Sequence, residues 1–197
     1  MSHQRNQATN PVALVSYQPA GDTLQAFHDS DALVRCIIGP IGSSKTTSAI
    51  VEVLAMINDQ VPDANGVRLS RWAVVRNTTV DLKASTIKDW NQVCPPQVGK
   101  MTLQPPITQR ISYLHEDGFT SVRAEVLFLG FDTMDVKKIR GLQLTGAWCD
   151  EAKELPKEVP DMLLGRCGRY PARRQVANYP YGMIWTSNAP ARDEWLG

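Results

Sequence analysis

The chain has no long hydrophobic run and no excess of charge of one sign. Its apolar runs are far shorter than the roughly 18 residues that predict a membrane-spanning helix, and residues 1–10 are polar. With 21 basic and 20 acidic residues the net charge is +1, which excludes a globally basic surface for nucleic acid. We therefore expect a soluble intracellular protein with no membrane partner, in which any contact with DNA comes from local patches.

The sequence also offers little for metal or disulfide chemistry. Its cysteines, Cys36, Cys94, Cys149 and Cys167, show neither paired metal-ligand spacing nor the framework of a disulfide-rich domain. We expect reduced cysteines in the core, because a free cysteine packs as a small hydrophobic side chain. The three histidines are scattered along the chain, and we expect each of them at the surface.

Buried strands alternate with helical segments along the chain. The length of 197 residues fits one domain. The predicted strands are 34–38, 72–76, 109–114, 121–129, 144–149 and 182–185, and the predicted helices are 24–28, 47–57, 80–93, 135–140 and 156–164. This alternation indicates an α/β fold with a mostly parallel sheet flanked by helices. Two of the strands form an antiparallel hairpin, and residues 1–20 are predicted to be a loose arm.

Residues 39–46 follow the first strand and have the pattern of a phosphate-binding loop. Gly39, Lys45 and Thr46 are in register with Gly, four residues, Gly, Lys, Ser or Thr, while Ser44 replaces the second glycine. The next helix would direct backbone N–H groups and its positive dipole end at an anion. Lys45 is expected to reach the β- and γ-phosphates, and the Thr46 hydroxyl to bind Mg²⁺. The predicted nucleotide-binding residues are Gly39, Pro40, Ile41, Gly42, Ser43, Ser44, Lys45, Thr46 and Thr47.

An alternative interpretation of this loop is a Gly/Ser turn with a solvated Lys45. The apolar residues of 47–57 recur at helical spacing, so the helix that a phosphate loop needs is present. The order of strand, loop and helix therefore favours phosphate binding.

The strand 144–149 ends in two acids, Asp150 and Glu151. In P-loop ATPases such a strand places its aspartate near Mg²⁺, and the next glutamate polarises the attacking water. We predict Asp150 as a metal-site residue and Glu151 as the general base. Alternatively both carboxylates are solvated, or they cap the following segment. Two signatures at the carboxyl ends of two strands favour a shared crevice.

The last predicted strand runs into Thr186, Ser187 and Asn188. A polar residue at this position can contact the γ-phosphate or its water and so report hydrolysis. Alternatively the strand ends in a turn whose Asn188 bonds its own backbone. The position of this segment after the acidic strand favours the functional interpretation.

In this order the motifs resemble those of bacteriophage terminase large subunits, the ATPases that package viral DNA into a capsid. Residues 39–46 resemble the Walker A loop of that family. Residues 138–142 followed by 148–152 resemble its Walker B region, and 186–188 followed by Pro190 resemble its coupling motif. The matches span about residues 35–190. Ser44 departs from the family's glycine and adds a Cβ where the backbone packs close to phosphate.

The resemblance implies a P-loop NTPase fold of the ASCE or RecA-like type in a single domain over residues 1–197, without the nuclease domain that the family carries after its ATPase. It implies ATP and Mg²⁺ as cofactors, Thr46 and Asp150 at the metal, Glu151 as catalytic base and Asn188 as coupling residue. The implied partners are double-stranded DNA, the portal protein and the small terminase subunit in the host cell cytoplasm. We expect a homo-oligomeric ring on the procapsid and a weakly active monomer in isolation.

A ring ATPase usually completes its site with an arginine from a neighbouring subunit. Arg140 resembles the position of the trans-acting arginine finger proposed in related terminases. Arg166 and Arg169, in the densest basic cluster, are the alternatives, and either one is equally well a solvated loop charge. Arg76 follows a strand beside the expected site, where it senses phosphate or is simply exposed.

Three other functions share parts of this pattern. The first is a different DNA-dependent ATPase, such as a helicase or a recombination motor. The second is a nucleotide kinase, against which the adjacent Asp150 and Glu151 argue. The third is a non-catalytic nucleotide-binding assembly module.

Overall fold

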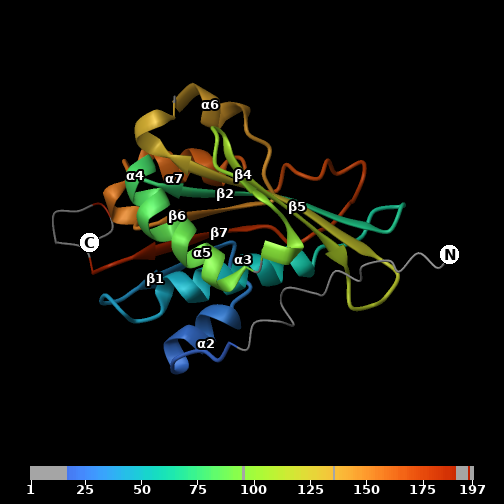
Figure 1. Cartoon of the computed structure of the whole chain (residues 1–197), viewed down its shortest axis with the longest axis horizontal. Coiled ribbons are helices and arrows are strands. Elements are labelled where there is room, and N and C mark those ends of the chain that lie inside the picture. The colour runs from blue at the N-terminus through green and yellow to red at the C-terminus, as the bar shows by residue number, and fades with distance from the viewer. Residues whose placement is uncertain (1–16, 95, 135, 190–194, 196–197) are drawn as a thin grey trace.

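A computed structural model describes residues 17–94, 96–134, 136–189 and 195. Its strands form one sheet in the order β1-β7-β6-β2-β5-β4-β3 (Figure 1). The strands are β1 (Val34–Ile38), β2 (Val67–Arg76), β3 (Met101–Thr102), β4 (Ile107–Leu114), β5 (Ser121–Gly130), β6 (Gly146–Asp150) and β7 (Gly182–Ser187). Neighbours from β1 to β5 are parallel, whereas β4 pairs antiparallel with both β5 and β3. The predicted α/β class, the mostly parallel sheet and the hairpin are confirmed.

Helices cover both faces of the sheet (Figure 1). They are α2 (Asp22–His28), α3 (Lys45–Asn58), α4 (Thr79–Asp81), α5 (Ile87–Val93), α6 (Val136–Gly141) and α7 (Glu158–Leu164). The shorter turns are the π-helical η1 (Leu82–Thr86) and the 3-10 turns η2 (Pro96–Val98), η3 (Phe131–Thr133) and η4 (Ala152–Glu154). Between α4 and α5, η1 continues the helix, so the predicted helix 80–93 contains a π turn that its sequence pattern did not indicate. Among the described residues no helix is long and apolar enough to cross a membrane.

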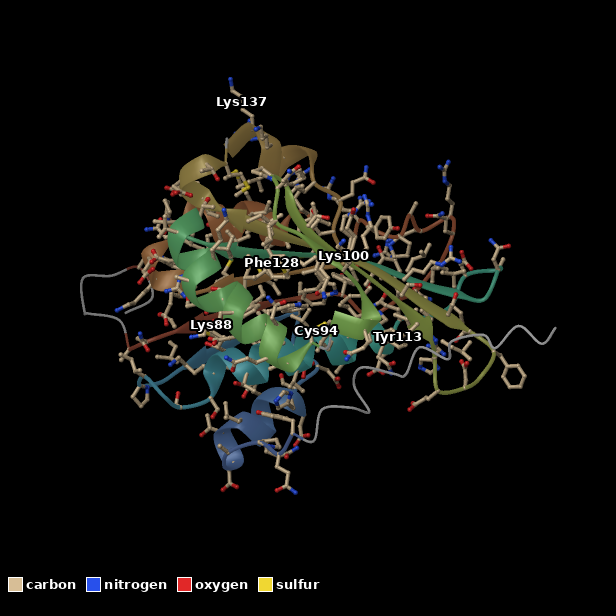
Figure 2. The ribbon with its side chains drawn as sticks, viewed as in Figure 1. Lys88, Cys94, Lys100, Tyr113, Phe128 and Lys137 are labelled. Carbon is tan, nitrogen blue, oxygen red and sulfur yellow. The ribbon has the colours of Figure 1, made fainter. Side chains whose placement is uncertain are left out.

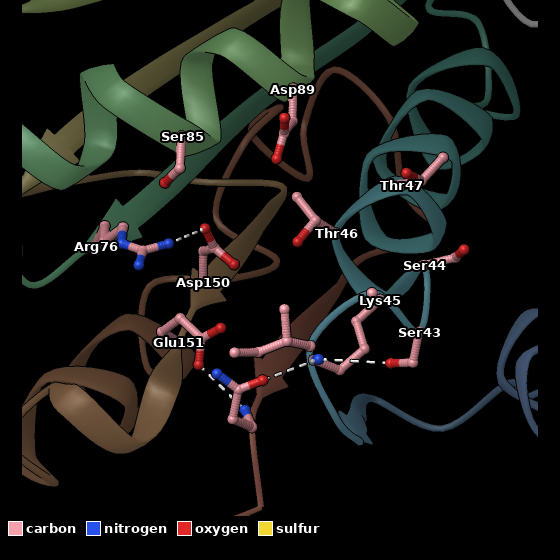
Figure 3. Close-up of a pocket in the computed structure, with 13 residues that line it drawn as sticks. Ser43, Ser44, Lys45, Thr46, Thr47, Arg76, Ser85, Asp89, Asp150 and Glu151 are labelled. Carbon is pink, nitrogen blue, oxygen red and sulfur yellow. Dashed lines mark hydrogen bonds and ion pairs between the residues drawn. The ribbon is translucent and has the colours of Figure 1, made fainter.

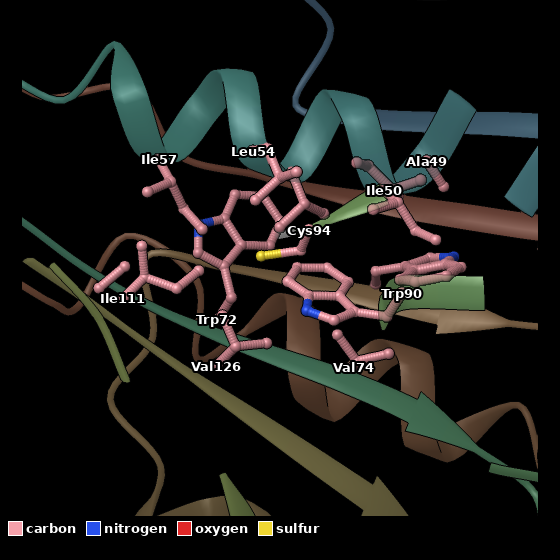
Figure 4. Packing of buried hydrophobic residues seen from close by; sticks show 14 of the residues in the cluster. Ala49, Ile50, Leu54, Ile57, Trp72, Val74, Trp90, Cys94, Ile111 and Val126 are labelled. Carbon is pink, nitrogen blue, oxygen red and sulfur yellow. The ribbon is translucent and has the colours of Figure 1, made fainter. Parts of the chain in front are cut away.

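Strand β2 shows why the apolar runs are continuous. Trp72 and Val74 join the cluster beneath α3 and α5 (Figure 4). Ala73 and Val75 join the cluster beneath α7, and all four side chains are fully buried. A strand that is buried on both faces has no polar face to alternate with. Side chains such as Phe128 and Cys94 fill the layer between the sheet and α5 (Figure 2).

Strand β1 lies at the sheet edge, where the expectation of core cysteines is only partly right. Arg35 and Ile37 are buried, whereas Cys36 and Ile38 on the opposite face are exposed. The prediction of a core cysteine is therefore wrong for Cys36. The helices on its face of the sheet, α6 and α7, pack against the inner strands and leave the edge strand uncovered. Cys94 and Cys149 are buried, Cys167 is half-buried, and all four thiols are free.

Two histidines also differ from the expected surface role, and His3 lies outside the described residues. His115 is buried, and its Nδ1 lies 3.0 Å from Asp117. His28 Nδ1 lies 2.6 Å from the Glu52 carboxylate of α3. The predicted arm is described only from Tyr17 onward, and the hydroxyl of Tyr17 lies 2.6 Å from the hydroxyl of Ser48. Each of these polar side chains therefore has a partner that we did not predict from the sequence.

Candidate functional site

A pocket of about 540 Å³ opens at the carboxyl ends of β1, β7, β6 and β2 (Figure 3). It is lined by residues 41–47, which span the end of the loop after β1 and the first turn of α3, by Asp150, Glu151 and Asn188, and by Arg76, Ser85 and Asp89. Parallel strands bring their carboxyl ends to one edge, and β7 lies between β1 and β6. The topology therefore brings together three predicted motifs that are far apart in the sequence.

The loop between β1 and α3 turns on two residues with positive φ. Gly42 has φ 80°, and Ser44, which immediately precedes α3, has φ 61° and ψ 15°. The left-handed region costs a residue with a Cβ about 1–2 kcal/mol. A glycine suits position 44 because of this backbone angle. The Ser44 side chain is exposed, makes no capping bond and points away from Lys45 and Asp150 (Figure 3).

Lys45 is held inside the loop. The residue is only 6% exposed, and its Nζ donates to the Pro40 carbonyl at 2.8 Å and to Asn188 Oδ1 at 3.1 Å. The alternative of a solvated lysine is therefore wrong. The ammonium group stands at the amino end of α3, where its charge and the helix dipole both favour an anion.

Asp150 is the buried acid of the pocket, with an exposed fraction of 2%. Its Oδ2 accepts bonds from Arg76 at 2.8 Å and from the Thr86 hydroxyl at 2.6 Å, and its Oδ1 accepts one from the Thr186 hydroxyl at 3.0 Å. Short bonds from a charged donor and from hydroxyls are strong and directional, so they hold the carboxylate in one orientation. The alternative of a solvated Asp150 is wrong.

Glu151 follows at the end of β6 in a left-handed conformation, with φ 49° and ψ 56°. Its Oε2 accepts the backbone N–H of Asn188 at 3.1 Å. Strain of this kind persists where the surrounding structure holds it, and it is frequent at functional sites. Nearby on η4, burial raises the pKa of the Glu154 carboxyl, while Arg76 lowers it. The pocket thus holds one acid fixed by three side chains and a second acid directed toward Asn188.

One side of the pocket is formed by η1 and α5, and we did not predict it from the sequence. Ser85, Thr86 and Asp89 come from this helix, and Thr86 contacts Asp150 directly. No motif marks these positions, because their approach to Asp150 depends on how η1 packs against the sheet at β5. Arg76, weighed from the sequence as a phosphate sensor or an exposed charge, is half-buried and bonded to Asp150.

The candidate finger arginines lie outside this pocket. Arg140 is exposed on α6, and its carbonyl accepts a bond from Arg166 at 2.9 Å. Arg169 is also exposed, and its backbone N–H bonds to Leu144. None of the three lines the pocket of its own chain. Pro190, which ends the predicted coupling motif, lies outside the described residues.

The pocket fits a nucleotide with a divalent ion. Thr46 and Asp150 face one another across it (Figure 3), and their hydroxyl and carboxylate oxygens are ligands that Mg²⁺ prefers. Within the described part of the chain, no group of three or more His, Cys, Asp or Glu residues could hold a metal. A divalent ion here would need further ligands, as Mg²⁺ does when it binds with phosphates.

No protein-family model and no curated protein matches this sequence, whereas several solved structures share its fold. The large terminase of a thermophilic bacteriophage matches with a TM-score of 0.59 at 12% identity over 93% of this chain. The same protein in complex with ATP-gamma-S matches with a TM-score of 0.56 at 12% identity, covering 91% of this chain and 37% of that one. The large terminase ATPase domain of Thermus phage P74-26 matches with a TM-score of 0.56 at 16% identity, covering 95% of this chain and 72% of that domain.

This chain spans 39% of the length of the first of these proteins. The TM-scores of 0.56–0.59 establish a common fold. The chain therefore has the fold of the ATPase domains of phage large terminases, and the predicted P-loop NTPase fold is confirmed.

Proposed function

We propose that this chain is an Mg-ATP-hydrolysing motor domain of a phage terminase large subunit. One observation carries the proposal: a single pocket contains the Lys45 ammonium, the Asp150 and Glu151 carboxylates and the Asn188 side chain. The matching structures named as complexes with ATP-gamma-S and ADP support nucleotide binding by this fold. Phosphoryl transfer needs positioned charge and little covalent chemistry, which suits this set of groups.

Each group has a distinct task in the proposed reaction. Lys45 and the loop N–H groups bind the phosphates, and the Thr46 hydroxyl and Asp150 hold the metal. When bound, Mg²⁺ neutralises phosphate charge. Glu151 accepts a proton from the attacking water, and its carboxylate is oriented for this by the Asn188 N–H at 3.1 Å.

Asn188 gives the site a means of reporting phosphate loss. Its side chain bonds Lys45 and its backbone bonds Glu151, so it lies between the phosphate-binding group and the base. We propose that γ-phosphate displaces the Lys45 contact and that its release restores the contact. β7 then transmits the change to the attached segments.

The proposed work is translocation of double-stranded DNA into a procapsid by a homo-oligomeric ring, with the portal protein and the small terminase subunit as partners in the host cell cytoplasm. The arginine that completes the site comes from a neighbouring subunit. Arg140 is our first candidate, because its position in the sequence resembles that of the finger proposed in related terminases, and because it is exposed and lies outside its own pocket. Arg166 and Arg169 are the alternatives.

Phosphate release from ATP with Mg²⁺ and without any acceptor tests the core of this proposal. We expect slow Mg²⁺-dependent release by the isolated chain and a loss of about 10²–10⁴-fold in Glu151→Gln. Nucleotide binding, measured with a fluorescent ATP analogue, should persist in this variant because the loop is unchanged. Equal release by Glu151→Gln and wild type would overturn the assignment of the base.

The same assay separates the alternatives. Release only when a nucleoside monophosphate is added would indicate a kinase, and binding without release would indicate an assembly module. ATP-driven DNA uptake by procapsids that carry portal protein distinguishes packaging from strand separation by a helicase.

A further inference from the structure

Three side chains converge on Asp150 from three separate elements. Arg76 lies at the end of β2, Thr86 in the π turn η1 and Thr186 in β7. We call Arg76, Thr86 and Thr186 the aspartate clamp. They donate to Asp150 at 2.8, 2.6 and 3.0 Å respectively, and Arg76 and Thr86 share the same oxygen, Oδ2. The clamp thus occupies both carboxylate oxygens and fixes the direction of the remaining lone pairs.

The π turn explains how Thr86 reaches this carboxylate. The backbone N–H of Ile87 bonds to the carbonyl of Leu82, five residues earlier instead of four. This wider turn lets Leu82 and Ile87 both join the same core cluster. Thr86 stands between them in sequence, fully buried, with its hydroxyl on Asp150. Single π turns in α-helices are rare and occur frequently at functional sites.

Thr186 extends the clamp into the core. Its hydroxyl accepts the indole N–H of the fully buried Trp148 at 2.9 Å, so its own proton is directed toward Asp150. Thr186 also lies two residues before Asn188 on the same strand end. The clamp is therefore continuous with the side of the pocket that contacts Lys45.

We propose that Thr86 and Arg76 are positioning residues for the metal-site aspartate, and that the π turn η1 serves to place Thr86. The proposal rests on the proposed function, because it assigns Asp150 to the Mg-ATP site. Donors that orient a ligating carboxylate usually contribute about 10–100-fold in metal affinity or activity. A purely structural role for Thr86 would instead be to satisfy a buried carboxylate, with no effect on the use of the metal.

The discriminating variant is Thr86→Val, which keeps the side-chain shape and removes the hydroxyl. Thr86→Ser is the matched control, because it keeps the donor and loses only a methyl group. Two quantities are measured for each protein. The first is the affinity for ATP-gamma-S with Mg²⁺ and with EDTA, and the second is the Mg²⁺ concentration for half-maximal phosphate release.

We expect Thr86→Val to bind ATP-gamma-S in EDTA as wild type does. The factor by which Mg²⁺ increases this affinity should be about tenfold smaller in Thr86→Val than in wild type. The Mg²⁺ concentration for half-maximal phosphate release should rise by a similar factor. In Thr86→Ser both quantities should stay at their wild-type values. If Thr86→Val does not fold, as judged by thermal unfolding, Thr86→Ala replaces it with the same expectation.

Wild-type Mg²⁺ dependence in a folded Thr86→Val protein would overturn the clamp while leaving the proposed function standing. Equal losses in Thr86→Val and Thr86→Ser would also overturn it, because the hydroxyl would not be the cause. A wild-type protein that neither binds nor hydrolyses ATP would overturn the proposed function, and the role of the clamp with it.

Discussion

The Nζ of Lys45 lies 3.1 Å from Oδ1 of Asn188, although 143 residues separate them in the sequence. This contact joins the loop after β1 to the end of β7, the strand beside β1 in the sheet. Both partners line the pocket, so a phosphate that binds Lys45 has to compete with an amide oxygen of the same chain.

Asn188→Ala removes this competitor. We expect its affinity for ATP to rise about threefold to tenfold, because a hydrogen bond to a charged group contributes roughly 1.5 kcal/mol. Phosphate release should fall in the same variant, since the coupling side chain is lost. Binding is measured with a fluorescent ATP analogue, with Lys45→Met as the control expected to bind weakly. Weaker binding by Asn188→Ala would contradict the competition.

Ser44→Gly tests the backbone angle of the loop. A glycine at φ 61° avoids the left-handed cost of a Cβ, so we expect Ser44→Gly to be about 1 kcal/mol more stable than Ser44→Ala. The Ser44 side chain is exposed, and we therefore expect ATP affinity to change by less than about threefold. Urea unfolding and nucleotide titration check the two quantities. A much larger gain in affinity would show that the Cβ obstructs phosphate.

Arg76→Gln tests the ion pair inside the pocket. The side chains of Arg76 and Asp150 are 15% and 3% exposed, so the variant leaves a buried carboxylate without its cation. We expect a loss of about 3 kcal/mol in the free energy of unfolding. Arg76→Gln combined with Asp150→Asn should lose less than the sum of the single changes, as measured by urea unfolding. Strict additivity would contradict a direct coupling.

The exposure of the four cysteines predicts which thiols react with a dye. Cys36 is exposed, whereas burial raises the pKa of the Cys94 and Cys167 thiols to about 12 and that of Cys149 further. A thiol-reactive dye should label one site in the folded protein and four in urea.

Partial burial also raises the pKa of Cys36. Its labelling rate should therefore keep rising as pH increases above about 8.5, because the thiolate is the nucleophile. Cys36→Ser should abolish fast labelling, and rapid labelling that persists in this variant would show that another thiol is accessible.

The strand and helix pattern was predictable from local chemistry, but several boundaries were not. β2 begins at Val67, whereas its apolar core suggested a start at Trp72, because the mixed polar and apolar residues 67–71 also pair with β5. The π turn η1 was also not predictable from the sequence, since it arises where Leu82 and Ile87 pack into one core. Cys36 was misplaced because a sequence does not show which strand forms the sheet edge.

The sequence by itself determined the Gly/Ser loop after the first strand, the acidic strand end and the order of the motifs, because each depends on residues that are neighbours in the chain. Only the tertiary structure decided the partners of Asp150, which lie 74, 64 and 36 residues away at Arg76, Thr86 and Thr186. Hydrogen bonds act over about 3 Å, so they are set by strand order and helix packing, which no local pattern specifies. The chemistry of the site is therefore encoded locally, and its geometry comes from the sheet.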